Sequence, residues 1–291
     1  MKTKKYTQQY KELFMKAVFF ITALTSIFAV LLICVFLFSN GIPAIKQVGL
    51  FKFLGSTNWA PNDVPPSYGI FPMILGSIYI TAGAVLIGVP IGILTAVFMA
   101  KYCPKKMYSV LKPATELLAG IPSIVYGFFG MVLIVPIVKT VFGGNGNSIL
   151  TASILLGIMI LPTIIGVTES AIASVPESYY EGSLALGATH ERSIFGVVLP
   201  AASSGITAGV ILGIGRAIGE TMAVIMVAGN QPAMPEGILY GVRTLTANIV
   251  IEMGYATDLH REVLIATGVV LFVFILIINI SFSLLKRRTV R

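Results

Sequence analysis

Charged residues are scarce in this chain, and their scarcity excludes most classes of soluble protein. Only 11% of its 291 residues are Asp, Glu, Lys or Arg, whereas a soluble domain carries about 25%. Hydrophobic residues make up 56%, and mean hydropathy is +0.92. The composition therefore predicts an integral membrane protein with no soluble domain of consequence.

Two further absences narrow the chemistry. The two cysteines, Cys34 in the first apolar run and Cys103 in a basic loop, lie at different depths, so we expect no disulfide and no metal site. No G-x-x-x-x-G-K-[ST] phosphate loop occurs, so the chain cannot cradle a nucleotide in that way. The glycine-rich run at 213–219 has the wrong spacing for a dinucleotide fold. We expect no catalytic residue, no metal ligand and no cofactor.

The basic residues are clustered, and the clusters predict topology. The net charge is +8. One group precedes the first apolar run, one follows the second, and one closes the chain: Lys2, Lys4, Lys5, Lys11 and Lys16; Lys101, Lys105, Lys106 and Lys112; Lys286, Arg287, Arg288 and Arg291. These groups lie on alternate sides of successive apolar segments, as the positive-inside rule expects of cytoplasmic loops. The basic residues therefore set the orientation in the membrane and do not indicate nucleic-acid binding.

Six apolar segments are long enough to cross a bilayer, which takes about 20 helical residues. They cover residues 17–38, 71–99, 117–139, 149–172, 205–229 and 263–285. We therefore expect an all-α polytopic membrane protein with both termini cytoplasmic. A basic N-terminus (1–16) and a basic C-terminus (286–291) flank one transmembrane domain (17–285). The first segment lacks a small-residue cleavage site, so we expect a retained helix and not a signal peptide.

The outer loops, at 39–70, 140–148 and 230–262, carry few distinctive features. Five apolar residues of the last loop recur at steps of three and four: Ile238, Val242, Leu245, Ile249 and Met253. They predict a short amphipathic helix that covers the bundle or docks a partner, with Arg243 and Glu252 off the stripe. We expect Trp59 to anchor the first loop at the interface and Glu169 to reach the cytoplasmic headgroups.

One face of the fifth segment collects small and charged residues. On a continuous helix, six residues project within one third of the circumference: Gly205, Gly209, Gly213, Arg216, Ala217 and Glu220. Small residues four apart allow close helix packing, so this face points toward protein or a water-filled path. At membrane depth, Arg216 and Glu220 would each cost about 2.5–3.5 kcal/mol if unpaired. Either they form a staple, with each other or with a neighbouring subunit, or Arg216 helps an anion across while Glu220 prevents its trapping.

The loop at 173–204 carries a motif with long-range spacing. Glu181-Gly-Ser-Leu-Ala-Leu-Gly187 is followed, after nine residues, by Val197-Val-Leu-Pro200. Behind Pro176, the pattern predicts a short helix with an acidic flank at Glu177 and Glu181. Its apolar tip is Leu184, Ala185 and Leu186, and Gly187 permits a turn with positive φ. Such a helix suits insertion into a groove on a soluble protein.

This spacing resembles the EAA loop of the membrane subunits of ABC importers. The chain departs from that pattern at three positions, with Gly182 and Ser183 for alanines and Val197 for isoleucine. The resemblance implies that five residues couple the chain to a separate ATPase: Glu181, Leu184, Ala185, Leu186 and Gly187.

Further stretches resemble the PstC family, one of two permease families of the bacterial phosphate ABC importer. They are Trp59-x-Pro61, Tyr68-Gly69-x-x-Pro72, Gly76-Ser77, Ala185-Leu-Gly-Ala188, Val198-Leu-Pro200, Gly213-Ile-Gly-Arg-Ala-Ile-Gly-Glu-Thr-Met-Ala-Val224 and Gly229-Asn230. The Gly-Arg-x-x-Gly-Glu-Thr run favours phosphate permeases. Met222-Ala-Val and Gly229-Asn favour the C type over the A type. The resemblance covers about residues 50–285.

The resemblance implies a type I, MetI-like permease fold of six helices in the bacterial cytoplasmic (inner) membrane. The subunit would import inorganic phosphate and would be non-catalytic, since ATP is used by partner subunits. The implied partners are a PstA-like second permease, two PstB-like nucleotide-binding subunits, a PstS-like extracytoplasmic phosphate-binding protein and membrane lipid. Arg216, Glu220 and Thr221 are implicated in the translocation pathway or its gate.

Four alternatives stay open. A permease for another oxyanion, molybdate or sulfate, has the same architecture, and transport competition would separate it. The A-type phosphate permease is a close relative. A secondary transporter has no use for a coupling loop, and ATP dependence would decide. A non-transporting scaffold has no use for costly charges at Arg216 and Glu220.

Overall fold

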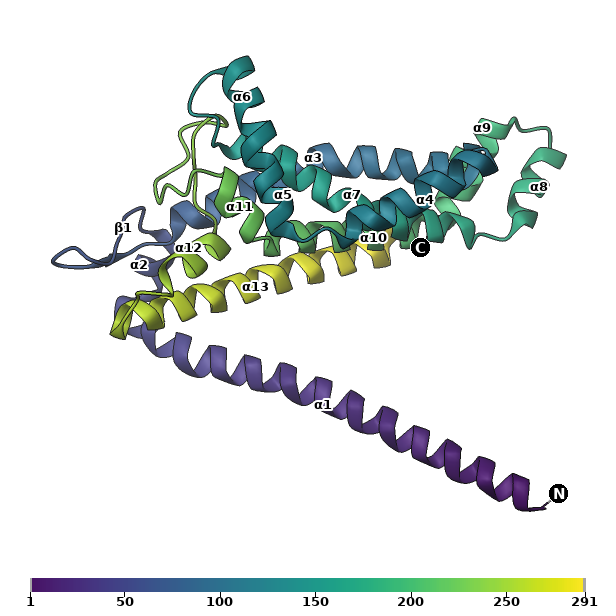
Figure 1. The fold of residues 1–291 in the computed structure, drawn as a ribbon, viewed down its shortest axis with the longest axis horizontal. Helices are drawn as coiled ribbons and strands as arrows, with labels where there is room; N and C mark the ends of the chain where they lie inside the picture. The colour runs from purple at the N-terminus through teal and green to yellow at the C-terminus, as the bar shows by residue number, and fades with distance from the viewer. Residues whose placement is uncertain (1, 290–291) are drawn as a thin grey trace.

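The computed structural model describes the backbone of residues 2–289 and the side chains of residues 11–281. The regular secondary structure of the described residues is helical, apart from one antiparallel pair of two-residue strands, in which Trp59 lies opposite Tyr68, and an isolated bridge between Gly229 and Val242 (Figure 1). The elements are α1 (Lys2–Val48), α2 (Leu50–Gly55), β1 (Trp59–Ala60), β2 (Ser67–Tyr68), α3 (Phe71–Val97), α4 (Lys105–Gly120), α5 (Ser123–Phe129), α6 (Val135–Phe142), α7 (Ile149–Ala173), α8 (Glu177–Ala185), α9 (His190–Ser193), α10 (Leu199–Gly219), α11 (Met222–Val227), α12 (Leu245–Glu252) and α13 (Asp258–Thr289). Single π-helical turns occupy Phe98–Tyr102, Gly130–Ile134 and Ile194–Val198.

Helix α7 lies at the centre of the bundle, between α3 and α10. Its side chains Leu155, Met159 and Ile160 are almost completely buried. Glycines let α3 approach closely: a Cβ on Gly88 would lie 2.7 Å from Ile160 Cγ1, and one on Gly92 would lie 2.8 Å from Ile164 Cγ2. The three helices therefore form a tightly packed core.

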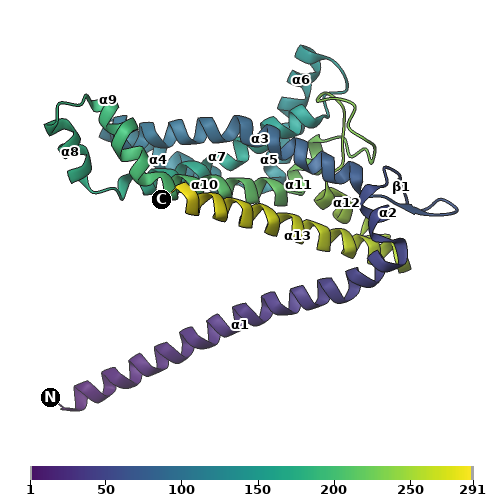
Figure 2. The same cartoon turned by 180° about the vertical axis from the view of Figure 1, so that it is seen from behind.

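Helices α1 and α13 form a second pair that meets at one end of the molecule. A Cβ on Gly41 would lie 2.6 Å from Val269 Cγ2, and the rings of Phe38 and Phe272 meet edge to face at 5.8 Å. From there α1 diverges from α13 (Figures 1 and 2). Its large apolar side chains between Leu13 and Phe36 are mostly exposed in this single chain.

The prediction of six membrane-spanning helices is confirmed. Among the described residues, six helical segments are long and apolar enough to cross a membrane: Lys11–Val48, Phe71–Tyr102, Ser123–Phe142, Ile149–Ala173, His190–Gly219 and Asp258–Ser281. The third begins later than expected because the chain turns at Ile121 and Pro122, where proline disfavours helix at the preceding residue.

The expected fifth span, 205–229, is wrong as one continuous helix. Helix α10 starts earlier and stops at Gly219, Glu220 is extended (φ −70°, ψ 132°), and α11 begins at Met222. The predicted amphipathic helix is shorter than its apolar stripe, since α12 covers Leu245–Glu252 alone. Most of the segment between the second and third expected spans belongs to helix α4, which packs on α7.

The two ends of the bundle differ in character. The strands, α2 and α12 lie at one end, and α8 and α9 lie at the other. The beginning of α1 and the end of α13 lie toward the α8 end in both views. We call the strand end the outer end and the α8 end the inner end.

Candidate functional site: a broken helix and a coupling loop

The end of α10 places Arg216 and Glu220 in different surroundings. Both side chains are half-buried. Arg216 Nη1 donates to Thr163 Oγ1 on α7 at 3.3 Å. Glu220 Oε1 accepts the backbone N–H groups of Thr221 (3.1 Å) and Ala223 (3.3 Å). Glu220 therefore caps the first turn of α11, where a negative charge is favourable.

Pairing of these two charges with each other, one of the alternatives left open by the sequence, is not seen in this conformation of the described chain. The four salt bridges among the described side chains do not include one between Arg216 and Glu220. The i,i+4 argument assumed a helix through both residues, and the helix ends between them. The guanidinium therefore has a neutral hydroxyl partner and keeps its charge available.

The backbone at the break is tied to the outer end. Thr246 Oγ1, at the start of α12, donates to the carbonyl oxygen of Glu220 at 3.0 Å. Thr221 donates its own hydroxyl to the Gly219 carbonyl at 3.3 Å. The break is thus held by side-chain hydrogen bonds that replace helical ones.

The small-residue face of α10 lies against α7. An added Cβ would lie 2.3 Å from Ala171 Cβ at Gly205, 3.0 Å from Thr168 Oγ1 at Gly209, and 2.8 Å from Ile164 Cγ1 at Gly213. This face points toward protein along these three turns. Arg216 continues the same contact surface one turn later, through Thr163.

The motif at 181–187 forms the predicted short helix and turn. Helix α8 begins directly after Pro176, and Gly187 has φ +88°. The side chains of Glu181, Leu184 and Ala185 are exposed, and Leu186 is 91% exposed. An apolar tip is therefore presented at the inner end (Figure 1).

An aromatic–histidine cluster, which the sequence did not suggest, joins this helix to the end of the α3 segment. Tyr180 Oη lies 2.7 Å from His190 Nδ1, and the ring of Tyr102 meets the His190 ring edge to face at 5.0 Å. Lys101 Nζ lies 5.7 Å above the Tyr180 ring and 3.7 Å from Glu177 Oε2. We call Tyr102, Tyr180 and His190 the inner clamp.

Glu169, which we expected to reach the cytoplasmic headgroups, is buried against α4. It accepts hydrogen bonds from Lys112 Nζ at 2.5 Å and Tyr108 Oη at 2.8 Å, both on α4. Glu169 raises the pKa of the Lys112 amine and of the Tyr108 hydroxyl, chiefly through these bonds. The basic segment that precedes the third span is thus fixed to α7 through α4.

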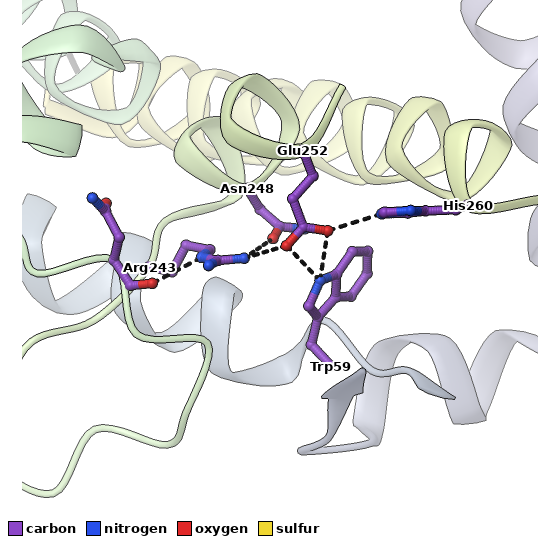
Figure 3. Close-up of polar contacts among 6 residues, drawn as sticks. Trp59, Arg243, Asn248, Glu252 and His260 are labelled. Atoms are coloured by element: carbon purple, nitrogen blue, oxygen red, sulfur yellow. Dashed lines mark hydrogen bonds and ion pairs between the residues drawn. The ribbon is translucent and has the colours of Figure 1, made fainter. Parts of the chain in front are cut away.

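A buried polar cluster at the outer end was also missed. Figure 3 shows the Glu252 carboxylate surrounded by donors from three other segments. Trp59 Nε1 lies 3.0 Å from both carboxylate oxygens, Arg243 Nη1 lies 2.5 Å from Oε1, and His260 Nε2 lies 2.8 Å from Oε2. Trp59 is 6% exposed, so its expected role as an interfacial anchor is wrong. We call Trp59, Arg243, Asn248, Glu252 and His260 the outer cluster.

Comparison with known proteins identifies relatives of this chain. Residues 88–291 match the model for the family described as "Binding-protein-dependent transport system inner membrane component". The chain is 42% identical to the "Probable ABC transporter permease protein YqgH" of Bacillus subtilis, over 88% of this chain and 86% of the relative. It is 35% identical to the "Phosphate transport system permease protein PstC" of Mesorhizobium japonicum, over 88% and 84%.

Solved structures confirm the predicted fold. A chain of the MetNI methionine ABC transporter, in an inward-facing form, aligns with a TM-score of 0.62 at 20% identity, over 76% of this chain and 96% of that one. A chain of a bacterial alginate ABC transporter in complex with its periplasmic protein aligns with a TM-score of 0.61 at 16% identity, over 90% and 94%. With a family model that covers more than half of its length, this chain belongs to the family of inner-membrane components of binding-protein-dependent transport systems and is a multi-pass membrane protein.

Proposed function

We propose that the chain is the C-type permease subunit of an ATP-driven importer of inorganic phosphate. Its similarity to the PstC relative over most of both chains supports phosphate as the substrate. The single structural observation that carries the proposal is the partner of Arg216. Among the described side chains, the Arg216 guanidinium bonds to the Thr163 hydroxyl and forms no salt bridge with a carboxylate, so it can bind an anion at membrane depth.

The proposed orientation puts the inner end in the cytoplasm. The basic clusters at the two ends of the chain and after the second span belong there under the positive-inside rule. The outer end, with the strands and α12, then faces the side from which a binding protein delivers substrate. The membrane is the bacterial cytoplasmic membrane.

The proposed partners divide the work. A PstA-like permease completes the pathway, and two PstB-like subunits bind and hydrolyse ATP, so this chain is not an enzyme. The exposed tip at Leu184, Ala185, Leu186 and Gly187, with Glu181 beside it, contacts an ATPase subunit. Closure of the ATPase pair then shifts the permeases between two conformations, because it favours one of them.

The charges at the helix break have separate roles in this proposal. Arg216 lowers the cost of bringing a multiply charged anion into the low-dielectric zone. Glu220 opposes tight retention of the anion by repulsion, and Thr221 adds a hydroxyl beside it. All three lie where α10 and α11 meet, so a change at this junction alters the pathway or its gate.

Transport by the reconstituted complex tests the proposal. Proteoliposomes that contain the permease pair and the ATPase should accumulate phosphate only with ATP and a phosphate-loaded binding protein. Excess sulfate or molybdate should not compete. Strong competition would assign another oxyanion, and uptake driven by an ion gradient without ATP would assign a secondary transporter.

A further inference from the structure

The hairpin tip between β1 and β2 projects from the outer end of the molecule (Figure 1). Every residue from Asn62 to Pro66 is exposed, and Val64 is 98% exposed. Prolines at 61, 65 and 66 restrict the backbone of this six-residue segment. Because Asn62 and Asp63 lie beside the exposed Val64, the tip is too polar to lie in lipid. It suits contact with the surface of a soluble partner.

Two buried aromatic residues fix the base of the hairpin. Trp59 and Tyr68, opposite each other across the strands, are 6% and 8% exposed, and their rings meet edge to face at 6.0 Å. Trp59 donates to the Glu252 carboxylate, which His260 and Arg243 also bind (Figure 3). A binding element fixed in this way loses little conformational entropy when a partner docks.

A chain of direct contacts links this anchor to the broken helix. Glu252 is the last residue of α12, and Thr246, near the first, donates to the Glu220 carbonyl. Arg243 also donates Nε–H to the Asn230 carbonyl at 3.0 Å, and Nη1 to Asn248 Oδ1 at 3.0 Å. A displacement of the hairpin therefore reaches Glu220 through one short helix.

We propose that residues 61–66 dock the extracytoplasmic binding protein, and that Glu252 is the positioning residue that links the docked hairpin to the break at Glu220. This inference rests on the proposed function, and the family is itself defined by dependence on a binding protein. The occupant is a soluble protein and not lipid, because Asp63 and Asn62 are exposed beside Val64. Asp63 gives the contact a negative charge, which selects a basic patch on the partner.

Cross-linking tests the docking surface. In a variant without Cys34 and Cys103, Val64→Cys carries a thiol–amine cross-linker and is mixed with purified phosphate-loaded binding protein. Val141→Cys is the matched control, since this valine is 66% exposed and belongs to the outer loop expected at 140–148. We expect a cross-link from position 64 and none from 141. No cross-link at 64, or equal yields at both positions, would overturn the docking assignment.

ATPase stimulation tests the same surface without a reagent. Val64→Asp and Asp63→Lys should each raise the binding-protein concentration for half-maximal stimulation about tenfold, which corresponds to about 1.4 kcal/mol of docking energy. Val141→Asp should leave that concentration unchanged. If the wild-type complex is not stimulated at all, the proposed function fails. Wild-type stimulation that Val64→Asp and Asp63→Lys leave intact overturns the hairpin alone.

Two variants of the anchor test the link to the break. Glu252→Gln weakens the charged contacts, and Trp59→Phe removes a single N–H donor but keeps an aromatic ring, so it should fold. Both should still cross-link through Val64→Cys, while maximal stimulation falls at least severalfold. Full stimulation in both variants would show that Glu252 transmits nothing.

Discussion

Arg216 and Glu220 lie four residues apart, yet they bind different partners on different elements. The guanidinium donates to Thr163 on α7, and the carboxylate caps α11. The helix end at Gly219 separates them. Because neither side chain neutralises the other in this conformation, each charge can be tested by itself.

Removing both charges should not restore transport. If the two residues balanced each other, the double variant would leave no unpaired charge and would be milder than Arg216→Gln alone. We expect Arg216→Gln to reduce phosphate uptake about 30-fold or more, from the loss of about 2 kcal/mol of contact with the anion. The double variant with Glu220→Gln should stay equally inactive. Uptake into proteoliposomes measures both.

Membrane insertion and assembly with the partner subunits are the controls for these variants. Near wild-type uptake in the double variant would show that the two charges only balance each other, although they bind different partners in this structure.

Gly187→Val should uncouple the permease from the ATPase. Gly187 has φ +88°, which a β-branched residue adopts with strain, and its surroundings are otherwise open. We expect the variant to insert normally while substrate-stimulated ATP hydrolysis is lost. Gly182→Ala is the control, because Gly182 is helical with open space around it, and alanine should favour the helix. Normal stimulation in Gly187→Val would contradict the coupling role of the turn.

We expect the Tyr180 hydroxyl of the inner clamp to contribute to coupling between the permease and the ATPase. Tyr180→Phe removes the bond to His190 and keeps the ring. A hydrogen bond contributes about 1 kcal/mol, so we expect ATPase stimulation to fall about fivefold. The adjacent Tyr179, 52% exposed on the same helix, supplies the control Tyr179→Phe. Equal effects of the two changes would exclude a specific role for the clamp.

The packing of α10 on α7 predicts opposite effects for two identical substitutions. Gly205→Ala places a Cβ 2.3 Å from Ala171, and overpacking costs about 1–3 kcal/mol. Gly215→Ala meets no atom within 4 Å and should gain up to about 1 kcal/mol of helix propensity. Thermal unfolding in detergent should therefore show a lower Tm for the first and an unchanged or higher Tm for the second. A Tm that is not lowered by Gly205→Ala would argue against this close contact.

The Lys112–Glu169 pair gives a pH-dependent prediction. Glu169 raises the pKa of Lys112 above its ordinary 10.5, so the pair stabilises the fold fully below that pH and is lost as pH rises through the raised value. Lys112→Gln should therefore lower the Tm by a constant amount from about pH 6 to 9. Lys106→Gln, an exposed lysine on the same helix, should have little effect. A gap between wild type and Lys112→Gln that shrinks within this range would contradict the assignment.

Features that depend on polarity along the chain were predictable. Six apolar segments, the exposed apolar tip of α8 and the positive φ of Gly187 follow from composition, spacing and the conformational freedom of glycine. The break at Glu220 did not follow, because residues 222–227 continue the apolar run. Hydropathy measures transfer into lipid and does not report where backbone hydrogen bonds stop.

The outer cluster was unpredictable for a different reason. Trp59 and Glu252 are 193 residues apart, and neither stands in a local pattern that indicates a partner. Arg243 and Glu252 were placed off the apolar stripe of an interfacial helix, where both would meet water. The short α12 instead has a buried first turn, with Leu245, Thr246 and Ala247 almost inaccessible. Only the folded arrangement brings these residues together.

The glycine contacts of α10 also determine which parts of the molecule can move separately. Gly205, Gly209 and Gly213 pack α10 against α7 over three turns, so we expect the two helices to move as one rigid unit. Helix α10 ends at Gly219, and the extended residue Glu220 is the point about which this unit would tilt. Such a tilt would break no hydrogen bond inside α10, yet it would change the distance between the Arg216 guanidinium and the Glu220 carboxylate. Alternation between two conformations would thus vary the electric field on a passing anion while both helices stay intact.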